Sequence, residues 1–163
     1  TLQTDCLILG GGLAGWMAAR EAAAAGLKTM LLHDGMGASA WVHGFNVPVY
    51  PEDSADIFLQ DTLASGQGLS DPALARALCQ DAAEVFDEIR AMGLSFNREK
   101  DGSYQALRPL GASWPRVVSI GNETGAAILT RLKEMLKGSV TELPATRALK
   151  LLKDGSRVRL VEN

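Results

Sequence analysis

Residues 1–34 read TLQTDCLILGGGLAGWMAAREAAAAGLKTMLLHD, and their pattern decides the fold of the chain. An apolar run at 5–9 leads into a glycine run at 10–15, an alanine-rich segment follows, and a second apolar run covers 28–32. Two short apolar runs that flank a glycine turn and an alanine-rich segment are typical of strand, turn, helix and strand. We therefore predict an α/β protein that opens with a β-α-β unit.

The glycine run has the G-x-G-x-x-G spacing of a dinucleotide-binding turn. In such a turn Gly10 permits the tight bend, Gly12 lets the backbone approach a pyrophosphate, and Gly15 lets the helix pack closely on the sheet. Leu13 and Ala14 then lie in the first helical turn, where free N–H groups and the helix dipole favour phosphate oxygens. We predict a dinucleotide site here; the alternative is a glycine turn that binds no nucleotide.

The acidic residue that usually binds the ribose hydroxyls is missing from the end of the second apolar run. It is expected about 20 residues after the glycine turn, where this chain has His33, with Asp34 one position later. Either Asp34 reaches the ribose, or backbone and His33 make the contact. For the His33 side chain, a partly exposed strand-end histidine is as good an interpretation as a cofactor contact.

The composition is that of an ordinary globular protein of about one domain, with 163 residues, 47% apolar residues and a formal net charge of -3. The mild acidity and the lack of a basic, aromatic-rich patch argue against nucleic-acid binding. No apolar run is long enough for a transmembrane segment. Cys6 and Cys79 make no disulfide framework, so we expect reduced thiols and a cytoplasmic protein. His33 and His43 lack partners at ligand spacing, so no metal site is expected.

Residues 35–45, GMGASAWVHGF, have neither helical nor strand periodicity and are predicted to form a loop. Small residues such as Ala38 and Ser39 come first and large ones later. A fold that placed a flat ring system near its first crossover would need such a loop, because backbone N–H groups can then face ring heteroatoms. Since Trp41 and Phe45 are costly to leave in water, we expect burial against protein or cofactor, with a plain surface loop as the alternative.

The middle of the chain predicts two helices, one at 53–65 and one from Asp71 to Gly93, where Asp71-Pro72 is a strong start signal. The second helix has an apolar stripe at three- and four-residue steps, which we expect to face the core. The stripe consists of Leu74, Leu78, Ala82, Val85, Ile89 and Met92. The carboxylates beside it are interpreted as a solvated face rather than as catalytic acids, and they are Asp81, Glu84, Asp87 and Glu88.

The remaining elements are predicted from turn residues and short apolar runs. They are a hairpin at 94–108 around Asp101-Gly102, a loop at 110–116, a helix from Gly125 to Gly138, a strand near Val140, and a terminal hairpin of 148–152 with 157–161. Arg116 in the loop is either an anion contact or, as we favour, a surface charge.

Several of these segments, taken in order, resemble the N-terminal flavin-binding region of the fumarate reductase, succinate dehydrogenase and L-aspartate oxidase flavoprotein family. The resemblance extends over essentially all 163 residues. It rests on ILGGGLAG, on the loop ending HGF where the family has a glycine-glycine-aliphatic signature, on QDTLASGQGLSDPALARAL, AMGLSFNREKDG and PRVVSIGNETGAAIL, and on LLKDGSRVRLV. It implies an α/β, Rossmann-like FAD-binding fold of the glutathione-reductase type, incomplete in this chain and ending in a β-hairpin.

The resemblance also implies where FAD would bind. The glycines of 10–15 would hold the pyrophosphate, residues 36–44 would line the isoalloxazine ring, and residues 146–148 would meet the adenine through their backbone. The implied cofactor-binding residues are Gly10, Gly12, Leu13, Ala14, Gly15, His33, Asp34, Ala38, Ser39, His43, Gly44 and Ala148.

Two departures from the family pattern qualify this resemblance. The histidine that carries covalent flavin in some members aligns with Gly37, and His43 occupies a signature glycine position, so noncovalent FAD is expected. Where aspartate oxidases and their relatives have a Gly-His-Ser before Arg116, this chain has Gly111-Ala112-Ser113. The lost histidine argues against a dicarboxylate substrate.

By the same resemblance, we expect the FAD-binding segment of a flavin-dependent oxidoreductase that transfers hydride between flavin and a small organic substrate. No residue stands in a motif that demands catalysis, so none is assigned as general acid or base. The alternatives are a glycerol-3-phosphate or ketosteroid dehydrogenase-like flavoprotein, and a non-catalytic nucleotide-binding module or subunit.

Family members run to several hundred residues. We therefore expect residues 1–163 to be the N-terminal part of an FAD-binding domain, without the substrate-binding cap domain. The remainder of the polypeptide or a second subunit would complete the fold, and the chain alone is expected to be inactive.

Overall fold

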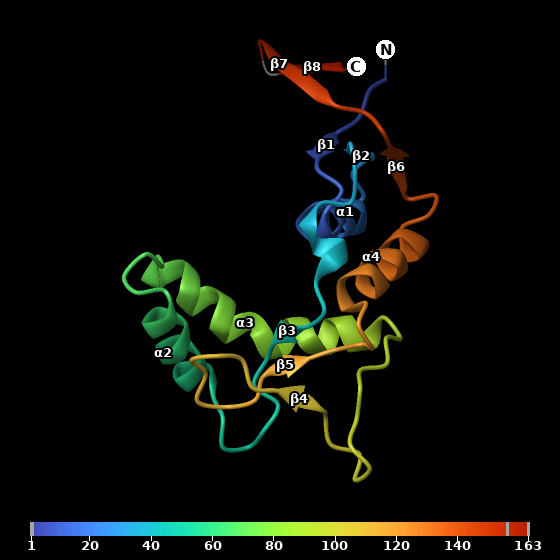
Figure 1. Cartoon of the computed structure of the whole chain (residues 1–163). Coiled ribbons are helices and arrows are strands. Elements are labelled where there is room, and N and C mark those ends of the chain that lie inside the picture. Colours follow the sequence, from blue (N-terminus) through green and yellow to red (C-terminus); the bar gives the residue numbers. More distant parts are fainter. Residues whose placement is uncertain (1, 156, 163) are drawn as a thin grey trace. The chain divides into compact units, whose positions relative to one another are not determined.

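The computed structural model describes residues 2–155 and 157–162 (Figure 1). The chain divides into two compact units. Unit 1 combines the stretch that ends at Trp41 with the stretch that begins at Gly125, whereas unit 2 is the continuous segment Val42–Thr124. In the sequence, unit 2 is thus an insertion between the two parts of unit 1.

Unit 1 contains the predicted β-α-β unit, formed by β1 (Cys6–Leu9), α1 (Leu13–Ala24) and β2 (Thr29–Leu32). β2 pairs in parallel with β1 on one side and with β6 (Val140–Leu143) on the other. All four β2 residues are buried, as is usual for the central strand of a parallel sheet. The helix α4 (Thr124–Met135) precedes β6. The predicted α/β fold class is confirmed.

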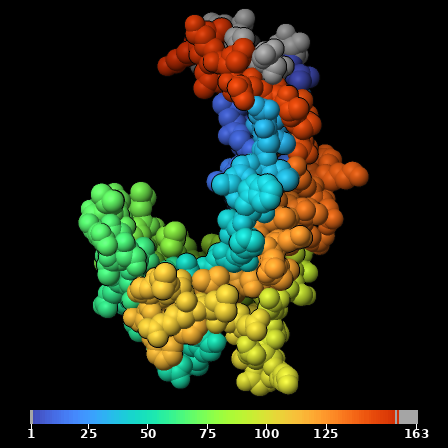
Figure 2. Space-filling view, viewed as in Figure 1, coloured from blue at the N-terminus to red at the C-terminus, as the bar shows by residue number. Residues whose placement is uncertain are grey.

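The described part of the chain ends in an antiparallel hairpin of β7 (Ala148–Asp154) and β8 (Arg157–Glu162), as predicted. The hairpin is red in Figure 1, and β7 is red in Figure 2. Leu149, Leu151 and Leu152 of β7 are exposed. Several neighbouring exposed leucines give this hairpin an apolar surface, which is unusual for a strand in contact with water.

Unit 2 contains two packed helices, α2 (Ala55–Ser65) and α3 (Pro72–Ala91). The side chains of Ser54 and Asp71 accept hydrogen bonds from backbone N–H groups in the first turns of these helices. The start signal at Asp71 is confirmed. The first helix begins at Ala55 rather than at residue 53, because Ser54 is its cap.

The core between these helices uses a different face of α3 from the predicted stripe. α2 packs against Ala75 and Cys79, while Leu74 and Leu78 are 71% and 60% exposed. The prediction is wrong for Leu74, Leu78 and Val85, which are exposed, whereas Ala82 packs against this core and Ile89 and Met92 are buried. Two adjacent rows of α3 are apolar, and the row with the smaller side chains lets α2 approach more closely.

A small antiparallel sheet in the order β3-β5-β4 completes unit 2. Its strands are β3 (Phe45–Asn46), β4 (Ala106–Leu107) and β5 (Val117–Val118). In the described residues, the hairpin predicted at 94–108 is reduced to the single bridge Arg98–Tyr104, because β4 pairs with β5.

An aromatic cluster packs beside this sheet. Phe45 lies edge-on to Phe86 and Phe96, with ring centroids 5.8 and 5.7 Å away, and Tyr104 lies 5.1 Å from Phe86. Edge-to-face pairs of this kind stabilise by about 0.5–1.5 kcal/mol beyond the burial of their area. The expected burial of Phe45 is therefore met by protein contacts.

Candidate functional site

The glycine turn between β1 and α1 depends on two positions that tolerate no side chain. Gly10 has a φ of 121°, which favours glycine, and its N–H donates to Leu32 O at 2.9 Å. A Cβ on Gly15 would lie 2.0 Å from Gly10 O and 3.6 Å from the Ile8 side chain. Gly10 thus makes the bend, and Gly15 allows the close approach of helix to strand.

Gly12 is the N-cap of α1 and leaves the end of this helix open. Within α1 as described, Gly12 makes no side-chain cap bond and the first turn holds no acidic residue. A Cβ on Gly12 would meet Ser39 Oγ at 3.3 Å, and Leu13 N donates to that same oxygen at 3.1 Å. Ala14 is exposed beside them. The positive end of the helix therefore suits an anion such as a pyrophosphate.

The segment after β2 lies directly against the glycine turn. A Cβ on Gly11 would be 2.6 Å from both Gly35 O and His33 Cγ, and a Cβ on Gly37 would be 3.6 Å from Gly12 Cα. We call residues 10–15 together with 33–39 the cradle. Sequence reasoning missed the close approach at Gly11, for which the third consecutive glycine was the available signal.

His33 is buried inside the cradle, with 7% of its surface exposed. Its Nε2 lies 2.8 Å from Glu142 Oε1, and its Nδ1 accepts a hydrogen bond from the N–H of Gly35 at 3.1 Å. The interpretation of His33 as a partly exposed strand-end residue is wrong, because Glu142 of β6 offers a partner inside the protein. Both ring nitrogens are bonded to protein, so the imidazole has no free polar atom for a ribose.

Glu142 connects His33 to the cation of Lys133. Lys133 Nζ of α4 lies 2.7 Å from the same carboxylate oxygen and 5.1 Å from the ring centroid of Trp16. Burial alone would raise the pKa of Glu142, but the hydrogen bonds from Lys133 and His33 outweigh it and hold the pKa of this carboxyl below its ordinary value. Glu142 is therefore ionised near neutral pH and orients both partners.

Asp34 extends from the cradle toward solvent. Its carboxylate binds Arg147, with Nη2 at 2.6 Å and Nε at 3.1 Å, and both side chains are exposed. Ala148, the first residue of β7, follows directly. The structure thus brings Asp34 close to the segment expected to meet the adenine, while Arg147 is a neighbour that the sequence did not reveal.

His43 and Gly44 lie in unit 2 and are held there by its own residues. His43 Nδ1 donates to Asn122 O at 2.7 Å, and the hydroxyl of Thr124 donates to His43 O. A Cβ on Gly44 would be 2.6 Å from Val118 O, so glycine is required for the contact with β5. Protein contacts thus fix both residues in position, and their role in cofactor binding stays a prediction.

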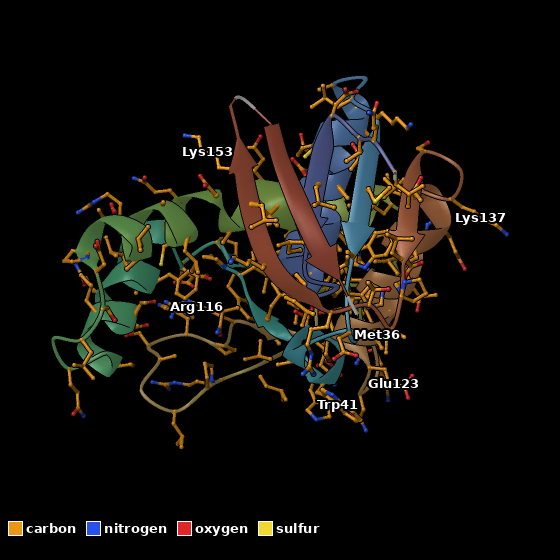
Figure 3. All side chains as sticks on the ribbon, turned by 90° about the horizontal axis from the view of Figure 1, so that it is seen from above. Met36, Trp41, Arg116, Glu123, Lys137 and Lys153 are labelled. Carbon is orange, nitrogen blue, oxygen red and sulfur yellow. The ribbon has the colours of Figure 1, made fainter. Side chains whose placement is uncertain are left out.

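The predicted loop between β2 and β3 contains a short 3-10 helix, η1 (Ala38–Trp41). Ala38 is exposed at its start, and Trp41 is 81% exposed at its end (Figure 3). The expected burial of Trp41 against protein is wrong, because its side chain reaches no pocket in the described residues. Burial of Trp41 against a cofactor remains a prediction.

Arg116, labelled in Figure 3, is a buried charge with 1% of its surface exposed. Its Nε and Nη2 bind Asp53 at 2.6 and 2.7 Å, and its Nη1 binds Asp61 at 2.5 Å. Ser113 also donates to Asp61 through its N–H and its hydroxyl. The interpretation of Arg116 as a surface charge is wrong; it ties the loop at 110–116 to α2.

This cluster also sets the ionisation of its members. Burial would lower the pKa of Arg116, but the bonds to Asp53 and Asp61 outweigh it and raise that pKa. Burial would raise the pKa of Asp61, but the Ser113 N–H and Arg116 lower it below its ordinary value. Arg116 is thus saturated by protein carboxylates, which leaves it unsuited to a substrate anion.

Two other kinds of site were sought in the described residues. No group of three or more histidine, cysteine or carboxylate side chains lies close enough there to hold a metal ion. Among the helices described, none has the length and apolarity needed to cross a bilayer.

The family profile described as "FAD binding domain" matches residues 5–162. The chain belongs to this family. FAD is accordingly its cofactor, and the open helix end in the cradle suits the pyrophosphate of such a molecule. Within this FAD-binding domain family, the predicted Rossmann-like fold and flavoprotein resemblance are confirmed.

Curated relatives of this FAD-binding chain include two kinds of enzyme. An L-aspartate oxidase of Agrobacterium fabrum is 32% identical over 156 residues, which cover 92% of this chain and 30% of that protein. One subunit of the fumarate reductase (CoM/CoB) of Methanothermobacter marburgensis is 32% identical over 141 residues, covering 81% of this chain and 26% of that protein. The chain therefore spans about 30% of the length of such relatives.

Solved structures share the fold. A variant of E. coli quinol fumarate reductase FrdA superposes with a TM-score of 0.88 at 25% identity, over 99% of this chain and 29% of that one. A 3-ketosteroid-Δ4-(5α)-dehydrogenase from Rhodococcus jostii RHA1 has a TM-score of 0.79 at 21% identity, over 98% of this chain and 42% of that one. The second likeness shows the fold alone.

Proposed function

We propose that residues 1–163 form the N-terminal FAD-binding segment of an oxidoreductase that acts on a small organic substrate, as fumarate reductases and aspartate oxidases do. The observation that carries the proposal is the cradle, in which the N-terminal end of α1 has no side-chain cap from Gly12 and no acidic residue in its first turn. FAD, when bound, supplies hydride transfer at its flavin ring. The residues of the chain bind and orient it.

Different segments of the chain would contact different parts of FAD. The N–H groups at Gly12, Ala14 and Gly15 would face the pyrophosphate, and the carboxylate of Asp34 would bind the ribose, since it is exposed and His33 is not. Residues 36–44 would line the flavin ring, with the exposed Trp41 among them. The backbone near Ala148 would meet the adenine.

We further propose that FAD is held without a covalent bond. Gly37 takes the position that carries a flavin-linked histidine in the covalent members of the resembled family. Its φ is 64°, a backbone conformation that favours glycine, so a side chain there would be strained. Glycine offers no side-chain atom to which a flavin could be attached.

The substrate is expected to differ from a dicarboxylate. Ala112 stands where aspartate oxidases have a histidine, and it is buried, while Ser113 is committed to Asp61. A ketosteroid dehydrogenase-like activity is the second candidate, since the same fold also occurs in the Rhodococcus enzyme. In the complete enzyme, reoxidation of the reduced flavin by 4-androstene-3,17-dione would support this second candidate, whereas reoxidation by fumarate would contradict the expectation that the substrate is not a dicarboxylate.

The remainder of a longer polypeptide or a second subunit would supply the substrate-binding part. In the described sheet β1 has a strand neighbour on one side, and Leu9 at its end is exposed. An open strand edge of apolar residues is where further strands add.

Both cysteines are free thiols, which supports the proposed cytoplasmic location.

The test is FAD binding by the purified chain. Noncovalent binding predicts a yellow protein that releases FAD on acid precipitation, and flavin that stays with the precipitate contradicts it. Gly12→Val should abolish uptake while the chain stays folded, because the added side chain fills the approach to the helix end. Ala18→Val, an exposed site on the same helix, is the matched control. A Gly12→Val chain with unchanged FAD content would overturn the site assignment.

A further inference from the structure

The imidazole of His33 is held in one tautomer. A backbone N–H can only donate, so the Nδ1 that receives the Gly35 N–H at 3.1 Å must carry a lone pair. The ring proton of the neutral histidine therefore sits on Nε2 and is donated to Glu142 Oε1 at 2.8 Å. Both contacts are satisfied by the same tautomer, which has its proton on Nε2 and its lone pair on Nδ1.

The same ring is packed against the glycine turn. A Cβ added to Gly11 would fall 2.6 Å from His33 Cγ and 2.6 Å from Gly35 O, so the turn, the ring and the residue that the ring holds are in close contact. The backbone of His33 is also committed, with its N–H donated to Leu143 O and its carbonyl accepting the N–H of Thr146. No polar group of His33 remains for a ligand.

Charges around His33 come from three elements. Glu142 of β6 faces Nε2, Lys133 of α4 binds the same carboxylate oxygen, and Asp34 next along the chain is paired with Arg147. An acidic side chain at position 33 would have no donor for Glu142 and would repel it. Glu142 therefore needs a hydrogen-bond donor at position 33. This need accounts for the histidine at the position where the dinucleotide fingerprint has an acid.

We propose that His33 is a positioning residue for FAD: through its Nδ1 it fixes the Gly35 turn on the glycine turn, and so places Asp34, rather than itself, at the ribose. This rests on the proposed FAD site in the cradle. Glu142 acts one step further away by holding the ring in the tautomer that accepts from Gly35.

Two substitutions test the roles of the two ring nitrogens separately. His33→Asn places an amide oxygen near Nδ1, so it keeps an acceptor for Gly35 and loses the contact with Glu142. His33→Gln places an amide nitrogen near Nε2, so it keeps the donor to Glu142 and loses the acceptor. The proposal predicts an FAD Kd within about twofold of wild type for His33→Asn and about five- to tenfold weaker for His33→Gln.

The readouts are FAD titration by flavin fluorescence and ¹⁵N NMR of the imidazole in the FAD-free chain. An Nε2–H tautomer, with the Gly35 amide protected from exchange in wild type and His33→Asn but not in His33→Gln, supports the proposal. Equal Kd values for the two variants, or an Nδ1–H tautomer, overturn it. The NMR measurement on wild type decides even if a variant fails to fold.

A wild-type chain that binds no FAD overturns the proposed function, and with it the role of His33 toward FAD, whatever the NMR shows. A wild-type chain that binds FAD while both variants bind equally well overturns this inference alone. The two failures are therefore distinguishable.

Discussion

Each unit encloses an ion cluster, and the two clusters differ in what stays accessible around them. In unit 2 the guanidinium of Arg116 binds both Asp53 and Asp61, so its positive charge is already paired within the protein. In unit 1 His33 and Glu142 are joined inside the protein, while the cradle above them keeps an open helix end. A buried ion cluster can therefore fix a fold in one unit and shape a binding surface in the other.

The largest expected effect comes from removing the cation of unit 2. Arg116→Met leaves the fully buried Asp53 carboxylate without a cation, and we expect a loss of about 3–5 kcal/mol in the free energy of unfolding. Urea denaturation measures it. The matched control is Arg90→Met, which removes an exposed ion pair with Asp87 and should cost less than about 1 kcal/mol. Equal losses of unfolding free energy in the two variants would contradict the distinction between the buried cluster of Arg116 and the exposed ion pair of Arg90.

The next effect separates two glycines of unit 1. Gly15→Ala should destabilise by about 1–3 kcal/mol, because its Cβ meets Gly10 O, although alanine gains up to about 1 kcal/mol in helix propensity. Gly12→Ala should cost about 1 kcal/mol or less, since its nearest neighbour is a hydroxyl at 3.3 Å. Thermal unfolding without FAD gives both values. A larger cost at Gly12 would contradict the geometry of the turn.

A smaller effect compares one hydroxyl in each unit. Ser39→Ala removes the acceptor of Leu13 N, and Ser54→Ala removes the cap of α2, so each should cost about 0.5–2 kcal/mol. The FAD affinity should fall for Ser39→Ala alone, because only that hydroxyl borders the cradle. Parallel melting curves and FAD titrations test this. Loss of FAD affinity in Ser54→Ala would mean that the two units do not act separately.

The smallest effect is a dependence on pH. The pKa of Glu142 is lowered on folding, so the stability it contributes is fully present above its ordinary pKa of 4.5 and is lost as the pH falls through the lowered value. Glu142→Gln should therefore flatten the acid limb of the stability curve of unit 1. Denaturation midpoints between neutral pH and pH 3 measure this limb. An unchanged acid limb would show that Glu142 gains nothing from its partners.

The sequence was informative where local pattern and burial agree. The strands, glycine turn and helix at 5–32 are readable because the central parallel strand β2 is apolar on both faces and glycine spacing reports backbone geometry. The stripe on α3 was misread because two neighbouring helical rows are apolar, and periodicity does not choose between them. The choice depends on α2, which packs on the small side chains of Ala75 and Cys79.

The ion clusters were not readable for another reason. His33 and Glu142 are 109 positions apart, and Arg116 and Asp53 are 63 apart, so no local signal pairs them. Arg116 looked like any loop arginine, and Asp53 like the start of a helix. Such pairs form only when the fold brings distant residues together. The bend of the glycine turn, by contrast, depends on the backbone conformation of its own glycines, which the sequence shows directly.

The insertion of unit 2 between β2 and β6 also sets the order in which the protein folds. β2 meets its neighbour β6, in the register Thr29 to Val140, after the whole of unit 2 has been synthesised. A compact unit 2 shortens the loop to be closed and so lowers its entropic cost. The contact of His33 with Glu142 arises at this late step. The side-chain contact that orients His33 beside the cradle thus depends on a residue that follows the whole of unit 2 in the sequence.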